Sequence, residues 1–132
     1  MPIPKYFKHA RHVPLAALLL TVAVHAEARE QTLGVAIAPR HQWSEFSLPL
    51  GCRQADALQL QIERGDVRLD YVRVNFRKGG SQRLDVRRDL RENDRTIWFK
   101  IADYRSCITS IDFLGRTRNS SDPARIPVKG RS

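Results

Sequence analysis

The stretch Asn119-Ser120-Ser121-Asp122 gathers the side chains of this 132-residue chain that could most readily do chemistry. A serine nucleophile needs a base within about 3 Å, and the stretch offers an acid without a base and no Gly-x-Ser-x-Gly elbow. Short Asn, Ser and Asp side chains instead bond to nearby backbone N–H groups. The preceding Gly115 would let the chain leave a strand at unusual angles. We therefore predict a structural loop, with a serine hydrolase as the alternative.

The sequence lacks the residue patterns of other common catalytic and metal-binding sites. His41 is the only histidine after residue 25, so a histidine metal cluster is excluded and a Ser-His-Asp site would depend on this one residue in a polar loop. Asp66, Asp70 and Asp122 could ligate a metal, but no loop of alternating oxygen ligands surrounds them. No spacing singles out a carboxylate pair for glycoside hydrolysis. We expect no catalytic residue, no metal and no cofactor.

The N-terminal segment has the three parts of a secretory signal peptide. A basic front without acids precedes an apolar run over residues 13–24, and small residues follow it. The run is shorter than the about 20 residues that a membrane-spanning helix needs. We predict a cleaved signal helix over residues 1–26, a mature chain that starts at Glu27 (Arg29 as the alternative start), and a periplasmic location.

Cys52 and Cys107 are the only two cysteines, and both follow the predicted cleavage site. An even cysteine count in an exported chain favours a disulfide. Closing a loop of 55 positions stabilises a fold by about 4 kcal/mol on chain-entropy arguments. A catalytic thiol is the alternative, but there is no Cys-x-x-Cys motif and no histidine close to either cysteine in sequence. We predict a structural disulfide.

The chain is basic, with a formal net charge of +9. Removing residues 1–26 takes away three of the 23 Lys and Arg residues and none of the 14 Asp and Glu residues, which leaves +6. Most of the remaining cations are arginines, whose planar fork suits carboxylate and phosphate. Export argues against nucleic acid, so anionic polymers, lipid head groups or another envelope protein are the expected partners. From the charge alone, we favour the alternative of a solvated arginine surface that maintains solubility.

The elements that must position these residues are strands. Apolar residues alternate with period two, and turn residues separate the segments. We predict an all-β fold: a single compact antiparallel β-sandwich, jelly-roll-like, of about seven or eight strands over residues 27–132. The phase changes between Leu69 and Val72, which predicts a bulge near Asp70 and Tyr71. The tail from Lys129 to Ser132 is expected to fray. The alternating segments are LGVAIA, LQLQI, VRLDYVRVNF, TIWFKI, CITSIDF and RIPV.

The turn at Gly79-Gly80 predicts a hairpin whose register sets an arginine face. If inward residues oppose each other, Val74 meets Leu84, Val72 meets Val86, Arg73 meets Asp85 and Tyr71 meets Arg87, around a three- or five-residue loop. This register predicts one exposed anion-binding face. Its members are Arg73, Arg77, Arg83 and Arg87, with Asp85 among them.

Six segments, in order, carry a resemblance to a known family: LGVAIAPR (33–40), LPLGCR (48–53), Gly65-Asp66, SQRL (81–84), TIWFKI (96–101), and Cys107 leading into IDFLGRTRNSSDPA (111–124). In these the chain resembles the YaaI family of small exported bacterial proteins of unknown function. The resemblance implies export to the periplasm, a compact β domain and a shared cysteine pair. It implies no activity, and residues 85–95 fit it poorly.

Three functions remain open. The first is a non-catalytic binding or interaction module of the bacterial envelope, with no transmembrane segment after cleavage. The second is a structural or stress-related accessory protein without a small ligand, and the third is a hydrolase. We favour the binding module, because the arginine face is the most concrete surface feature and the hydrolase lacks a base. Fold class alone does not decide among them.

Overall fold

The computed structural model describes residues 29–132 apart from 41 and 119–120. The predicted signal peptide (1–26), His41, Asn119 and Ser120 lie outside the described residues. The described part contains no helix long and apolar enough to cross a membrane. Its strands are β1 (Glu30–Ala38), β2 (Ser44–Arg53), β3 (Ala57–Leu60), β4 (Asp66–Phe76), β5 (Ser81–Leu90), β6 (Phe99–Lys100), β7 (Ile108–Arg118) and β8 (Ala124–Arg131).

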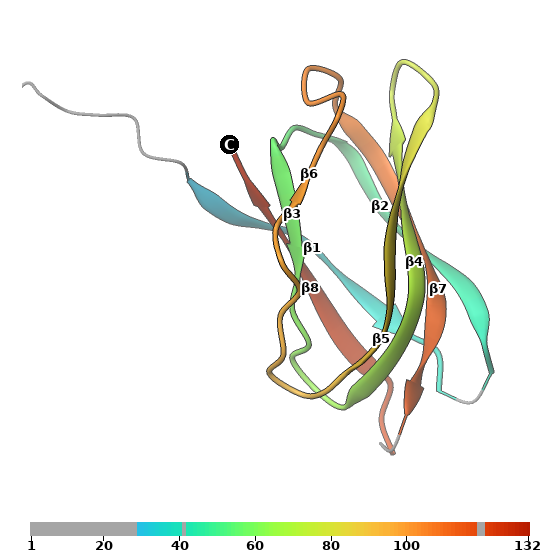
Figure 1. Ribbon diagram of the computed structural model, residues 1–132. Coiled ribbons are helices and arrows are strands. Elements are labelled where there is room, and N and C mark those ends of the chain that lie inside the picture. The colour runs from blue at the N-terminus through green and yellow to red at the C-terminus, as the bar shows by residue number, and fades with distance from the viewer. Residues whose placement is uncertain (1–28, 41, 119–120) are drawn as a thin grey trace, which may run out of the picture.

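The strands form two antiparallel four-stranded sheets, in the orders β1-β8-β3-β6 and β2-β7-β4-β5. The first strand therefore pairs with the last, the second with the seventh, the third with the sixth, and the fourth with the fifth. This is a long folded ribbon rolled into two layers, the jelly-roll arrangement, and Figure 1 shows the two sheets face to face. The predicted all-β, jelly-roll-like sandwich is confirmed.

The core lies between the two sheets and follows the period-two pattern. Val67, Leu69, Val72 and Val74 of β4 are at most 1% exposed, as expected for one face of a strand that covers a core. Phe113 of β7 is fully buried, and its ring stacks on Phe46 of the neighbouring strand with 5.0 Å between centroids. Ile126 and Val128 of β8 close the core from the other sheet.

The bulge in β4 is where the phase change predicted it, between Leu69 and Tyr71. The predicted hairpin register is wrong by two residues. Val72 faces Leu84, Val74 faces Gln82, Tyr71 faces Asp85 and Arg73 faces Arg83. The physical reason is the turn: Phe76 donates its backbone N–H to the carbonyl oxygen of Gly80 at 3.2 Å and accepts from the N–H of Gly79 at 3.0 Å, so the hairpin is centred on Lys78 and not on Gly79. A separate irregularity follows farther along β5, where Val86 and Arg87 both fall opposite Asp70 and Arg87 has a φ of 44°. A shift of two keeps each side chain on its predicted face, because side-chain direction alternates with period two.

Two further expectations about the strands are corrected, and one strand was missed. The run TIWFKI contributes only the two residues of β6, since Thr96 turns inward and bonds to Leu60 through its backbone N–H and its hydroxyl. The tail does not fray: β8 continues to Arg131, which pairs with Glu30 on one side and Ala57 on the other. Strand β2 was not predicted, because Pro49 and Gly51 interrupt its pattern. It is an edge strand, where such residues are tolerated.

Candidate functional site

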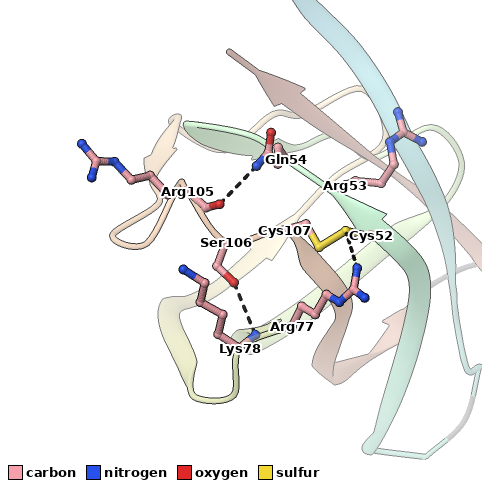
Figure 2. A pocket seen from close by; sticks show the side chains of 8 residues that line it. All are labelled: Cys52, Arg53, Gln54, Arg77, Lys78, Arg105, Ser106 and Cys107. Carbon is pink, nitrogen blue, oxygen red and sulfur yellow. Dashed lines mark hydrogen bonds between the residues drawn. A yellow bond between two sulfur atoms is a disulfide. The ribbon is translucent and has the colours of Figure 1, made fainter.

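A pocket of about 450 Å³ lies at one end of the sandwich, around the disulfide. Three connections build it: the end of β2 with the residue after it, the β4–β5 turn, and the β6–β7 loop. Figure 2 shows the lining residues around the two sulfur atoms, with the Arg77 guanidinium next to Cys52 and the Arg53 and Arg105 guanidinium groups extending away from the disulfide. They are Cys52, Arg53, Gln54, Arg77, Lys78, Arg105, Ser106 and Cys107.

Cys52 and Cys107 form a disulfide with their Cα atoms 5.1 Å apart, in agreement with the prediction from the cysteine count. The bond joins the end of edge strand β2 to the start of β7. The last regular pair between these strands is Pro49–Ser110, and pairing resumes only at Arg53–Ile108. The disulfide therefore spans the irregular part of the ladder, where backbone hydrogen bonds are interrupted.

Hydrogen bonds join the three connections to one another at the two cysteines or at residues one or two positions from them in sequence. The backbone N–H of Arg77 donates to the carbonyl oxygen of Cys107 at 3.0 Å, and its guanidinium Nη1 lies 4.0 Å from Cys52 Sγ. The backbone N–H of Lys78 donates to Ser106 Oγ at 3.4 Å. Gln54 Nε2 donates to the carbonyl oxygen of Arg105 at 3.1 Å. These bonds hold the three connections together around the Cys52–Cys107 disulfide (Figure 2).

The lining contains four cations and no carboxylate: Arg53, Arg77, Lys78 and Arg105. Within the described residues, none of the four has a carboxylate within 4.0 Å, whereas arginines elsewhere on the sandwich do. Like charges gathered without counter-charges produce a positive potential that attracts anions. Arginine forks and a lysine ammonium are the groups that bind phosphate and carboxylate.

The predicted arginine face divides in the structure. Arg77 belongs to the pocket, whereas Arg73 and Arg83 lie opposite each other on the outer surface of the β2-β7-β4-β5 sheet. The predicted Arg73–Asp85 pair is wrong. Arg83 pairs instead with Asp85 at 2.9 Å and lies over the Tyr71 ring at 4.2 Å.

The remaining arginines of that face also meet acids. Arg87 lies 4.0 Å from Asp70. Arg73 Nη2 bridges Glu45 at 3.4 Å and Asp112 at 3.1 Å. An anion that bound there would compete with these carboxylates, so anion binding by the sheet surface stays a prediction and the pocket is the stronger candidate.

Asp112 is the most highly coordinated carboxylate of the sheet surface, with its side chain 15% exposed. Ser47 Oγ donates to Oδ1 at 2.6 Å, and Asn75 Nδ2 and Arg73 Nη2 donate to Oδ2 at 2.9 and 3.1 Å. Partial burial acts to raise the pKa of the Asp112 carboxyl, but the hydrogen bonds from Ser47, Asn75 and Arg73 outweigh it, so the pKa lies below its usual value. The hydrogen bond to Asp112, together with the negative charges of Glu45 and Asp112, raises the pKa of Arg73.

We predict that Asp112→Asn lowers the free energy of unfolding at pH 7 by about 1–2 kcal/mol, the scale of hydrogen bonds to a charged group. Because the folded pKa is depressed, the carboxylate's contribution is present above the unfolded pKa of about 3.9 and is lost as pH falls through the folded value. Urea unfolding across this acid range should show a shallower loss of stability in the variant. The control is Asp85→Asn, at an exposed carboxylate with one ion pair. Equal acid slopes in Asp112→Asn and the unsubstituted protein would contradict the prediction.

The described part of the predicted structural loop lies in the β7–β8 turn, at the end of the sandwich away from the pocket (Figure 1). Arg40 Nη1 donates to the carbonyl oxygen of Ser121. At the base of the turn, Thr117 Oγ1 donates to Ala38 and accepts from the N–H of Ala124. These contacts do not involve the predicted bonds from the Asn119 to Asp122 side chains to neighbouring backbone N–H groups, so the structural role of this loop stays a prediction.

The candidate metal ligands are not gathered. Asp66 accepts a bond from the backbone N–H of Glu92, and Asp70 faces Arg87. Across residues 29–132 with the gaps at 41 and 119–120, no three histidine, cysteine or acidic side chains are grouped so that they could hold a metal ion.

Residues 13–130 match the sequence model of a family described as "Domain of unknown function (DUF2541)". The chain belongs to this family. It is 34% identical over 122 residues to proteins named "UPF0412 protein YaaI" from Salmonella newport (strain SL254) and Salmonella typhimurium (strain LT2), covering 88% of this chain and 90% of each relative. The resemblance to the YaaI proteins is thereby confirmed. No solved structure matches this DUF2541 chain significantly.

Sequence reasoning missed Arg53, Lys78 and Arg105 as members of the site. A signal was present: Arg53 directly follows Cys52, and Arg105 lies two residues before Cys107. A disulfide between the two cysteines must bring both basic neighbours to one place. The contribution of the Lys78 turn could not be inferred in this way, because it depends on which end of the sandwich the β4–β5 hairpin reaches.

Proposed function

We propose that this DUF2541 domain is a non-catalytic binding module of the bacterial envelope, and that it takes an anionic group in the pocket around the disulfide. The observation that carries the proposal is the set of four cationic side chains, from three separate connections, that line the pocket without a carboxylate. Cations on a merely soluble surface alternate with acids, as on the sheet surface of this domain.

The pocket suits binding better than catalysis. Its polar groups are guanidinium, ammonium, amide and hydroxyl groups, together with a disulfide whose sulfur atoms do not act as a thiolate. None of these is a base that could activate Ser106 or a water molecule at neutral pH. Electrostatic attraction and hydrogen bonding are what the arrangement can supply.

Retention on immobilised heparin tests the proposal. We predict that the triple variant Arg53→Gln/Arg77→Gln/Arg105→Gln elutes at clearly lower salt than the unsubstituted mature protein. The matched control Arg73→Gln/Arg83→Gln/Arg87→Gln removes the same charge from the sheet surface and should elute close to the unsubstituted protein. Retention should fall steeply with salt, since charges are screened beyond about 10 Å at 0.1 M.

Three outcomes of the heparin experiment would contradict the proposal. Equal shifts in both triple variants would mean that only overall charge matters, as expected for a solubilising surface. A larger shift in the sheet-surface variant would assign binding to the arginine face. An accessory protein without a ligand would show no retention that depends on the pocket cations.

The envelope location has its own test. We predict that protein recovered from the periplasm of an expressing bacterium has the intact mass of a chain that begins at Glu27, or at Arg29 if the alternative site is used. The basis is the charged front, the apolar run and the small residues of the N-terminal segment. A recovered mass that still includes residues 1–26 would exclude export by cleavage.

A further inference from the structure

The pocket is at the tip of the molecule. The β4–β5 turn, which carries Arg77 and Lys78, and the β6–β7 loop, which carries Arg105, project at the same end of the sandwich beyond the body of the sheets (Figure 1). A broad, flat surface could therefore reach the pocket cations without meeting the strands. A site for a small soluble anion does not need this placement.

An exposed aromatic ring accompanies these cations. Tyr104 in the β6–β7 loop is 47% exposed, and the guanidinium carbon of Arg105 lies 5.8 Å from its ring centroid. The one acid in the immediate neighbourhood in sequence is Asp103. Of the large hydrophobic side chains exposed in the described part of the chain, Tyr104 is the one adjacent in sequence to a pocket residue.

Cations and an exposed tyrosine at a loop tip fit one environment best. Tyrosine is enriched at membrane–water interfaces, where its ring contacts the apolar boundary and its hydroxyl stays hydrated. Basic side chains beside it are attracted by anionic head groups. A soluble polyanion would use the charges but would leave the ring of Tyr104 in water.

We infer that this end of the domain docks on an anionic lipid surface, with a head-group phosphate in the basic pocket and Tyr104 at the depth of the head groups. The inference rests on the proposed function, because the pocket cations must bind an anion. It adds the source of that anion, a lipid surface, and one residue outside the pocket, Tyr104.

Co-sedimentation with lipid vesicles tests the inference. The mature protein should bind vesicles that contain phosphatidylglycerol, and should bind vesicles of phosphatidylcholine alone far more weakly. Tyr104→Ser should weaken binding to the anionic vesicles roughly fivefold while leaving heparin retention unchanged. Soluble glycerol phosphate should compete poorly, because it offers the phosphate without the interface. The control Tyr71→Ser changes a ring that lies on the sheet surface beneath Arg83, and it should not alter vesicle binding.

A fluorescence measurement on Tyr104→Trp tests directly whether the side chain at position 104 enters the membrane interface. Relative to the unsubstituted protein, which has two tryptophans, the added emission should shift to shorter wavelength on anionic vesicles. Unchanged vesicle binding in Tyr104→Ser, or no vesicle binding with normal heparin retention, would overturn the inference and leave the proposed function standing. Strong competition by glycerol phosphate would also overturn it, in favour of a soluble phosphate ligand. Failure to bind both heparin and anionic vesicles would overturn both.

Discussion

Replacing Cys52 and Cys107 together by serine is expected to lower the free energy of unfolding by about 2–5 kcal/mol, the usual cost of removing a native disulfide from a small exported domain. The loop that the bond closes spans 55 positions, so the unfolded chain gains considerable conformational freedom when the bond is absent. A typical domain has only about 5–15 kcal/mol of stability in total, so the loss would be a large share of the free energy of unfolding.

The same substitution should also weaken anion binding, for a local reason. The Arg77 backbone bonds to the carbonyl of Cys107, and Ser106, which holds Lys78, precedes that cysteine directly. Without the bond, the end of β2 that carries Arg53 is held to this cluster only by the Arg53–Ile108 strand pair and the hydrogen bond from Gln54 to Arg105. The cations would spread apart, and an ordered arrangement would have to be recovered when the anion binds, which costs affinity.

Urea unfolding and heparin retention, each with and without dithiothreitol, separate the two effects. Dithiothreitol should change the unsubstituted protein toward the behaviour of the double serine variant and should leave that variant unchanged. Heparin retention must be compared where both proteins are folded. Retention that is identical in the folded variant and the unsubstituted protein would show that the pocket does not depend on the disulfide.

The outcomes of the sequence predictions follow from what a local pattern can encode. Alternation identified which residues of β4 are buried and located its bulge, because both depend only on side-chain direction along one strand. The register with β5 depends on a second segment, because the backbone bonds between Phe76 and both Gly79 and Gly80 centre the turn on Lys78, and the alternation of β4 carries no signal for this. The charge partners of Arg73 were out of reach for the same reason, since Glu45 and Asp112 come from β2 and β7.

The candidate site shows a similar division. The cysteine count predicted the disulfide, and the basic neighbours of both cysteines were present in the sequence. Which further connection completes the pocket is a property of the jelly-roll topology, because it brings the β4–β5 turn beside the disulfide. Tyr104 likewise becomes a candidate contact residue only because the β6–β7 loop projects at the pocket end of the sandwich. No spacing in the sequence predicts that position.

The prediction that position 115 needs a glycine agrees with the structure, but the physical reason given for it was wrong. It was predicted to let the chain leave a strand, but it lies inside β7, pairs with Ser44 and Leu69, and is not among the glycines with positive φ. Its role is to allow close approach. A Cβ atom there would overlap the carbonyl oxygen of Arg68 and would lie 2.7 Å from Leu69 Cδ2.

Gly115→Ala is therefore expected to lower the free energy of unfolding by about 3 kcal/mol, the upper part of the usual range for overpacking. The obstacle is backbone in β4, which is paired on both sides by β5 and β7 and cannot move without breaking a ladder. The matched control is Gly34→Ala, whose Cβ would have side-chain methyl groups of Leu48 and Leu50 as its nearest neighbours, at 3.1–3.2 Å. These can rotate away, and alanine also restricts the unfolded chain, so the control should change stability by about 1 kcal/mol or less in either direction.

Urea unfolding of both variants gives the comparison, and an equal loss of stability in both would refute close approach as the reason for Gly115.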